Sequence, residues 1–190
     1  MKNNSLVNFT INLEKILENN NTNKILFVSD RQNNDFVLSV KNVVKNLSIN
    51  KGNILLLECL DEEGYSFSDF VKNNYNGNNI LQKLDNVDYI KLSSSVDFSD
   101  VLSFEPNSFM ESIKSYDYIF MIVKDLSSSD LAYTLNKVFD SVILNISHEN
   151  NTITRVKKVT EKFNFLGMKV LGVTISKKES LFDKLFKKNK

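Results

Sequence analysis

The chain has 190 residues, of which 42% are apolar and 25% are charged, and its formal net charge is +1. This length and composition suffice for one sizeable hydrophobic core, and the near-neutral charge argues against nucleic-acid binding through a domain-wide basic field. No run approaches the roughly 18 apolar residues that a membrane-spanning helix needs. The single Cys59 excludes an intramolecular disulfide and fits a reducing compartment.

The N-terminal segment predicts a cytoplasmic protein. Met1–Ser5 leads into an amphipathic stretch and lacks the continuous apolar core of a signal peptide. A helix is expected over Leu6–Glu18, because apolar residues recur there at helical spacing. We expect one α/β domain over residues 1–176, in which 1–22 form the N-terminal helix and loop, and a separate C-terminal helix over 177–190.

Short apolar runs then alternate with longer helical patterns, which is typical of repeated βα units and a mainly parallel sheet. The apolar runs are continuous, as expected for strands covered on both faces. Predicted strands cover Lys24–Ser29, Asn53–Glu58, Val87–Lys91, Tyr116–Val123, Ser141–Ile146 and Lys169–Ile175. Predicted helices cover Asp35–Leu47, Ser66–Asn73, Asn78–Leu84, Asn107–Ser115, Ser128–Val138 and Asn151–Phe165. The pattern predicts a doubly wound, Rossmann-like fold of three layers.

The turn after the first predicted strand departs from what phosphate binding requires. A phosphate-binding loop needs glycines, so that backbone N–H groups can close around the phosphates, and a lysine that reaches the outer charges. Ser29–Leu38 reads Ser-Asp-Arg-Gln-Asn-Asn-Asp-Phe-Val-Leu and contains neither residue. The surrounding pattern is that of a nucleotide-binding fold, whereas the turn lacks the residues for nucleotide chemistry.

The order of segments resembles a known family, the bacterial tyrosine autokinases (BY-kinases) of capsule and exopolysaccharide export, relatives of the MinD and ParA deviant-Walker ATPases. Asn42 matches the asparagine that follows their phosphate loop. The other segments similar to theirs are Lys24–Ser29, Ile54–Leu60, Tyr116–Ile122, Ser129–Leu144 and Lys169–Ile175. The resemblance spans nearly the whole chain and implies a P-loop NTPase-like fold.

The departures from that family fall on its catalytic positions. With Ser29 and Asn42 held in register, the family's lysine falls on Phe36 and its serine or threonine on Val37 and Leu38. Its glycines fall on Asn33 and Asp35. The metal-binding hydroxyl and the phosphate-binding amine are therefore both absent.

The carboxylates of the family are also mostly replaced. At the end of the second strand Glu58 takes the first aspartate's place and Leu60 the second, and Asp61 could substitute only after a one-residue shift. The Walker B aspartate falls on Ile122, which we expect to face the vacated nucleotide pocket. A γ-phosphate and its Mg²⁺ need several fixed charges. The resemblance therefore implies a pseudo-ATPase or pseudokinase with no cofactor and no metal.

Three other candidate sites have simpler explanations. His148 follows a predicted strand, but an exposed loop histidine accounts for it. Glu58 and Asp61 could bind a metal together or serve as turn and capping residues. Cys59 lies at an apolar strand end, where a buried small hydrophobic residue is expected and not a nucleophile.

The C-terminal segment predicts a surface helix that contacts a membrane or a partner. Its apolar face would carry Leu181, Phe182, Leu185 and Phe186, and its basic face Lys184, Lys187 and Lys188 together with Lys177. Such a helix can lie at an anionic membrane surface, as the C-terminal helix of MinD-type ATPases does, or it can dock on the domain itself.

We expect a catalytically inactive protein that acts by protein contact, with a regulatory role in capsule or exopolysaccharide biosynthesis and export. Its partner would be a membrane polysaccharide co-polymerase or a homologous ATPase, and it could form a homodimer. One alternative is a divergent nucleotide-binding ATPase or tyrosine kinase that uses backbone amides and Arg31. Another is a MinD-like scaffold at the inner face of the membrane.

Overall fold

A single sheet forms the centre of the computed structural model, which describes residues 2–30, 33–60, 63–66, 70, 81–93, 105–124, 134–148 and 152–176. Its strand order is β3-β4-β2-β5-β1-β6-β7. The strands are β1 (Lys24–Ser29), β2 (Ile54–Cys59), β3 (Gln82–Leu84), β4 (Val87–Lys91), β5 (Tyr118–Lys124), β6 (Ser141–Ser147) and β7 (Lys169–Ser176). Neighbouring strands are parallel except for the antiparallel pair β3 and β4.

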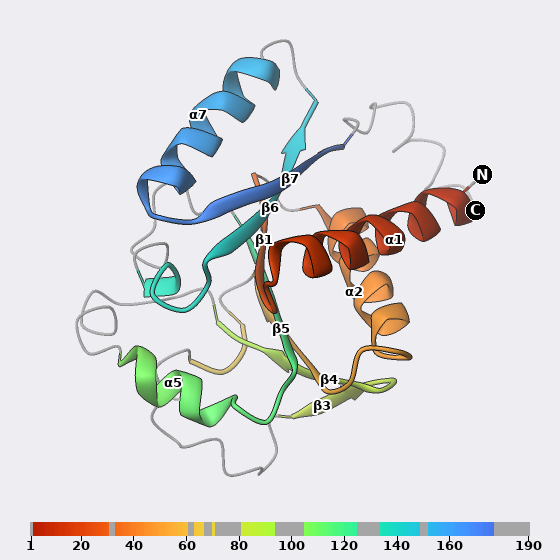
Figure 1. Cartoon of the computed structure of the whole chain (residues 1–190), viewed down its shortest axis with the longest axis vertical. Helices are drawn as coiled ribbons and strands as arrows, with labels where there is room; N and C mark the ends of the chain where they lie inside the picture. The colour runs from red at the N-terminus through yellow and green to blue at the C-terminus, as the bar shows by residue number, and fades with distance from the viewer. Residues whose placement is uncertain are drawn as a thin grey trace.

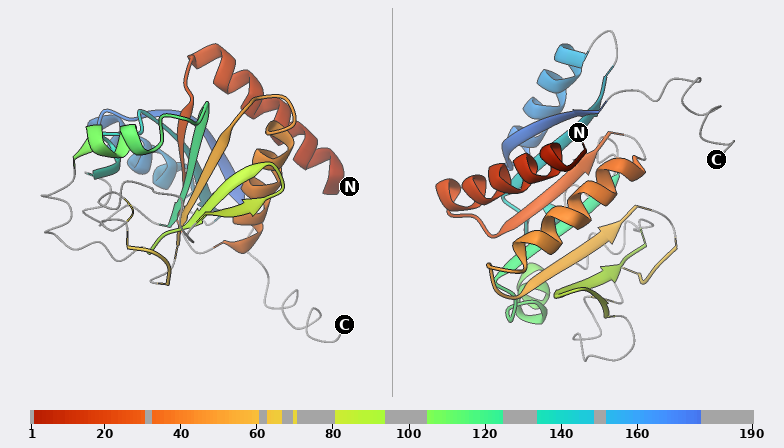
Figure 2. Two further views of the ribbon diagram at one scale, coloured as in Figure 1. Left: turned by 90° about the horizontal axis from the view of Figure 1, so that it is seen from below. Right: turned by 90° about the vertical axis from the view of Figure 1, so that its right-hand side faces the viewer.

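Helices cover both faces of this sheet (Figures 1 and 2). On one face lie α1 (Lys2–Asn20) and α2 (Asn34–Leu47), and on the other α5 (Pro106–Ser112) and α7 (Thr152–Phe165). The α2-side cluster joins Leu13 and Val40 to Phe27 and Leu56 of the strands. The α7-side cluster joins Phe109 and Phe163 to alternate strand residues, Leu55 and Leu144 among them. The fold is thus a three-layer α/β arrangement, as the sequence predicts.

The helix α2 follows directly from its sequence pattern. Val37, Val40, Val43, Val44 and Leu47 recur at helical spacing, and all five are buried, together with Phe36. The helix packs along the sheet next to α1. Because α2 begins just past the end of β1, its first turn lies at the carboxyl edge of the sheet, where ligands bind in open α/β folds.

The six predicted strands are confirmed, with ends that differ by at most two residues. The predicted helix over Asn78–Leu84 is wrong at its end, because Gln82–Leu84 forms β3 and pairs antiparallel with β4. Asp85 and Asn86 make the two-residue turn of this hairpin, and Asp85 has φ of 57°. Asp and Asn tolerate that left-handed conformation, so this dipeptide is a turn signal that outweighs the helical spacing.

The remaining helix predictions differ in their outcomes. The N-terminal helix is longer than predicted, and Asn107–Ser115 and Asn151–Phe165 are confirmed with small shifts as α5 and α7. Most of Ser66–Asn73, the first half of Ser128–Val138 and all of 177–190 lie outside the described residues. Within the described chain, no helix combines the length and the apolar character needed to cross a membrane.

Candidate functional site at the carboxyl edge of the sheet

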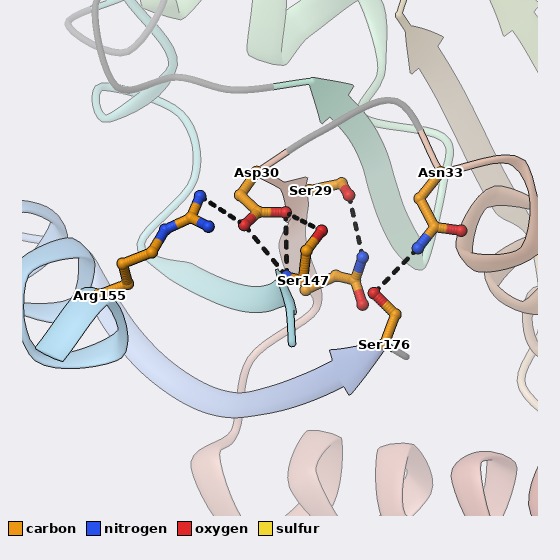
Figure 3. A network of polar contacts seen from close by, with 7 residues as sticks. Ser29, Asp30, Asn33, Ser147, Arg155 and Ser176 are labelled. Atoms are coloured by element: carbon orange, nitrogen blue, oxygen red, sulfur yellow. Dashed lines mark hydrogen bonds and ion pairs between the residues drawn. The ribbon is translucent and has the colours of Figure 1, made fainter. Parts of the chain in front are cut away.

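Polar side chains gather where β1, β6 and β7 end. Ser29 ends β1 and Asp30 follows it, Asn145 and Ser147 lie near the end of β6, and Ser176 ends β7. The three strands are parallel and adjacent, so their carboxyl ends meet at one edge of the sheet. Figure 3 shows Asp30 facing Ser147 and Arg155 of α7, and Asn33, at the start of α2, facing Ser176.

Asp30 is the most heavily bonded residue of this edge. Its carboxylate accepts hydrogen bonds from the backbone N–H of Ser147 at 3.1 Å to each oxygen and from the Ser147 hydroxyl at 2.9 Å. Arg155 Nη2 lies 2.7 Å from Oδ2 (Figure 3). The Asp30 side chain is only 8% exposed and that of Arg155 is 32% exposed. This aspartate, with its charge paired, connects the end of β1 to β6 and to α7.

A second set of hydrogen bonds runs through the buried Asn145. Its amide nitrogen donates to Ser29 Oγ at 2.9 Å, and its amide oxygen accepts from Thr174 Oγ1 at 3.0 Å. The same threonine hydroxyl lies 3.2 Å from the carbonyl oxygen of Leu144. These side chains satisfy one another in the interior, where an unpaired polar group would be costly.

The N-terminus of α2 is capped by its own chain. Asn33 Oδ1 accepts a hydrogen bond from the backbone N–H of Phe36 at 3.0 Å, and Asn33 Nδ2 donates to Ser176 Oγ at 3.0 Å. Asp35 lies in the first turn of the helix. In a phosphate-binding loop the N–H groups at this helix end point to the ligand. Here one of them is already bonded, and Asp35 adds a negative charge.

The predicted loop positions lie partly in the core and partly on the surface. Phe36 is buried, with its ring centroid 6.4 Å from that of Phe27 in an edge-to-face contact. Val37 is buried with it, whereas Leu38 is exposed. Ile122, in β5, is completely buried in the same α2-side cluster. The structure therefore brings Phe36, Val37 and Ile122 together as packed hydrophobic residues.

Glu58 belongs to a separate charged cluster. Its Oε2 lies 2.5 Å from Lys41 Nζ of α2, and this ammonium lies 4.7 Å from the ring centroid of Tyr89 and 3.4 Å from its hydroxyl. Burial, and then the nearby Glu58 charge, raise the pKa of Tyr89. Glu58 is thus paired with a cation of its own chain. Asp61, its predicted companion, lies outside the described residues.

Three further predictions concern the roles of His148 and Cys59 and the binding of a metal ion. His148 is exposed, and Cys59 is buried with its thiol 3.3 Å from the carbonyl oxygen of Ser93. Burial raises the pKa of the Cys59 thiol to about 12. Both findings agree with the simple roles expected for these residues. Within the described ranges, no group of three His, Cys, Asp or Glu side chains is placed to hold a metal ion.

The hydrogen-bonded residues of this edge are not among the sequence-based candidates, apart from Asn33. Asp30, Asn145, Ser147, Arg155 and Ser176 are missed. A signal exists, because Ser29-Asp30, Asn145-Ile146-Ser147 and Thr174-Ile175-Ser176 place polar residues at the ends of three apolar runs. In a parallel sheet such ends converge. Arg155 gives no comparable signal, since a basic residue on a helix is ordinary.

Comparison with solved structures shows the fold. The BceF tyrosine kinase domain matches with a TM-score of 0.72 at 11% identity over 90% of this chain and 76% of that chain. The VpsO kinase domain matches with a TM-score of 0.65 at 18% identity, over 94% of this chain and 98% of that chain. A ParA family ATPase from Chlorobium tepidum matches with a TM-score of 0.55 at 13% identity, over 83% of this chain and 74% of that chain. No protein-family model matches, and no curated protein is a significant match. At these identities the likeness establishes an α/β, P-loop NTPase-like fold.

Proposed function

We propose that this protein has the fold of a nucleotide-binding protein without its catalytic activity, and that it acts by contact with other proteins. The observation that carries the proposal is the set of hydrogen bonds and the ion pair at the junction between β1 and α2. There Asn33 caps α2, and Asp30 is paired with Arg155 and Ser147. Among the described residues of this junction, one N–H of the α2 N-terminus and the Arg155 guanidinium are thus already bonded to the chain itself.

Electrostatics support this proposal. A nucleotide triphosphate needs positive charge and free N–H groups around its phosphates. Among the described residues where β1, β6 and β7 end and α2 begins, the carboxylates are those of Asp30 and Asp35, and the Arg155 guanidinium is already paired with Asp30. Lys124, which ends β5 beside Ser29, is an exposed cation at this edge. Phe36 and Ile122 occupy the core, so neither position supplies a polar group. Arg31, on which a divergent nucleotide site would depend, lies outside the described residues.

The partner that we propose comes from the likeness to the kinase domains. If the chain shares their setting, it would bind a polysaccharide co-polymerase in the membrane or a homologous active ATPase, and regulate capsule or exopolysaccharide export. The lysine-rich segment 177–190 adds a proposed contact with the inner membrane surface, as for a MinD-like scaffold.

Two assays on the purified full chain test this function. Phosphate release from Mg·ATP and tyrosine phosphorylation should both stay at the level of a protein-free control. Affinity capture from native cells should then retain a membrane or ATPase partner, and the capture should not change when ATP is depleted. Turnover above the control would overturn the inactive assignment. Nucleotide-dependent capture would contradict a role that needs no nucleotide.

A further inference from the structure

The two edges of the sheet differ in how well they are protected. At one edge β3 has three residues, carries Lys83 and is the antiparallel arm of a hairpin. At the other edge β7 has eight residues, and among the described elements only β6 pairs with it. The two edges lie at opposite ends of the sheet (Figure 2). Natural proteins shield edge strands by shortness, charge or cover, because unpaired N–H and C=O groups recruit other strands.

Apart from a register shift against β6 that leaves Leu171 as an extra residue of the strand, β7 has little of that protection. Its only charged residue is Lys169, at its first position. Val173 and Ile175 are 37% and 56% exposed. In the register with β6, Val173 lies beside Leu144 and Ile175 beside Ile146, both of the α7-side cluster. The two exposed apolar residues therefore lie on the same face of the sheet, at its rim.

We infer that β7 pairs antiparallel with β7 of a second copy, which extends the sheet across a two-fold axis. In an antiparallel pair, residues opposite each other share a face of the sheet. The two-fold axis must therefore lie midway between one residue and the same residue of the second copy, and not between two consecutive positions of the strand. An axis at Thr174 places Val173 of one copy opposite Ile175 of the other, and the symmetry repeats that contact. Registers centred on Val173 or Ile175 lose it.

The absence of charged side chains also favours a second copy of the chain as the partner that pairs with the β7 edge. Between Gly172 and Ser176, the five residues that this register pairs, the strand has no charged side chain, so no like charges face each other. Cross-strand pairs of β-branched side chains stabilise such contacts. Thr174, on the axis, directs its hydroxyl to Leu144 and Asn145 of its own copy, so pairing leaves those hydrogen bonds unchanged. The inference does not depend on whether the protein binds nucleotide.

Sedimentation velocity over a concentration series tests the dimer. The wild type should show a reversible monomer–dimer equilibrium. Changing Val173→Lys and Ile175→Lys together should weaken it roughly tenfold or more, because like charges would then face each other. Ile49→Lys is the matched control, since Ile49 is exposed in the turn after α2. A monomeric wild type, or an equal effect of the control, would overturn the inference.

Disulfide trapping tests the register separately. Cys59 is buried, so new surface cysteines are the only accessible thiols among the described residues. A mixture of the Val173→Cys and Ile175→Cys variants should cross-link under mild oxidation more than either variant alone. Thr174→Cys should cross-link with itself. Equal yields in the mixture and in the separate variants, or no cross-link at all, would contradict the register and with it the proposed pairing.

Discussion

At the scale of single residues, Asp30 connects the parts of the candidate site, because its carboxylate binds both Ser147 and Arg155. We expect Asp30→Ala to lower the free energy of unfolding by roughly 1.5–3 kcal/mol, the usual worth of hydrogen bonds to a charged group. Urea unfolding would measure the loss. Asp30→Asn keeps the shape and one oxygen acceptor and should lose less. Equal stability of the wild type and Asp30→Ala would show that the ion pair contributes nothing.

The same variant offers a test of the donors around Asp30. The Ala variant leaves the Ser147 N–H, the Ser147 hydroxyl and Arg155 without their carboxylate, so added formate should bind there and restore part of the lost stability. Sodium chloride at equal ionic strength should not. Arg155→Met in the Asp30→Ala background should remove the formate effect. Formate stabilisation of the wild type to the same extent would contradict this explanation.

Cys59 makes stability depend on alkaline pH. Burial raises the pKa of its thiol from the ordinary 9.0 to about 12. Between these values the unfolded chain loses the thiol proton while the folded chain keeps it, so the free energy of unfolding should fall as the pH rises through 9. The raised pKa of Tyr89 adds a loss of the same sign at higher pH. Cys59→Ala should make the slope between pH 9 and 10 shallower, and an unchanged slope would contradict the assignment.

At the scale of elements, the cap of α2 can be separated from its link to β7. Asn33→Ala removes both the bond to the Phe36 N–H and the bond to Ser176, and should cost about 1 kcal/mol or slightly more. Asn33→Ser keeps a capping oxygen and should recover most of the loss. Thermal or urea unfolding of the two variants measures the difference. If both variants lose the same amount, the cap is not what stabilises this end of the helix.

The C-terminal segment 177–190 is a second element with a testable role. Burying a Leu or Phe side chain is worth about 1.5–3 kcal/mol, and each lysine near an anionic surface adds roughly 1 kcal/mol. We expect salt-sensitive sedimentation with anionic vesicles, lost when Leu181→Asp and Phe186→Asp are combined. Neutral vesicles serve as the control. If the double change unfolds the protein, or the wild type ignores vesicles at low salt, the segment belongs to the core.

At the scale of the whole molecule, the strands can be predicted from the sequence, whereas the candidate site can be predicted only in part. Continuous apolar runs such as Lys24–Ser29 indicate buried parallel strands without any tertiary information, and the stripe of α2 is equally plain. The strand order is not readable, because it depends on crossovers. The contact between Asp30 and Arg155 joins residues 125 positions apart, and only the completed fold brings them together.

Phe36 and Ile122, which fall where the kinase family carries a lysine and an aspartate, are buried, and this changes what a variant with those two charges would show. The sequence predicts that Phe36→Lys combined with Ile122→Asp would not restore hydrolysis, because the loop would still lack the glycines that let the backbone approach phosphate. Both side chains are buried in the α2-side cluster, so this variant would put a lysine and an aspartate into the core and should lose much of its stability.

Mg·ATP binding to the native chain is the measurement that tests the inactive assignment most directly. A ligand that binds only the folded state stabilises it by RT ln(1 + [L]/Kd), so about 1 mM Mg·ATP with a Kd of about 10 μM would add roughly 2.7 kcal/mol. Urea unfolding with and without Mg·ATP, with Mg²⁺ alone as the control, detects a change of that size. We predict superimposable transitions. A shift of 2–3 kcal/mol specific to the nucleotide would show that the site at the carboxyl edge still binds it.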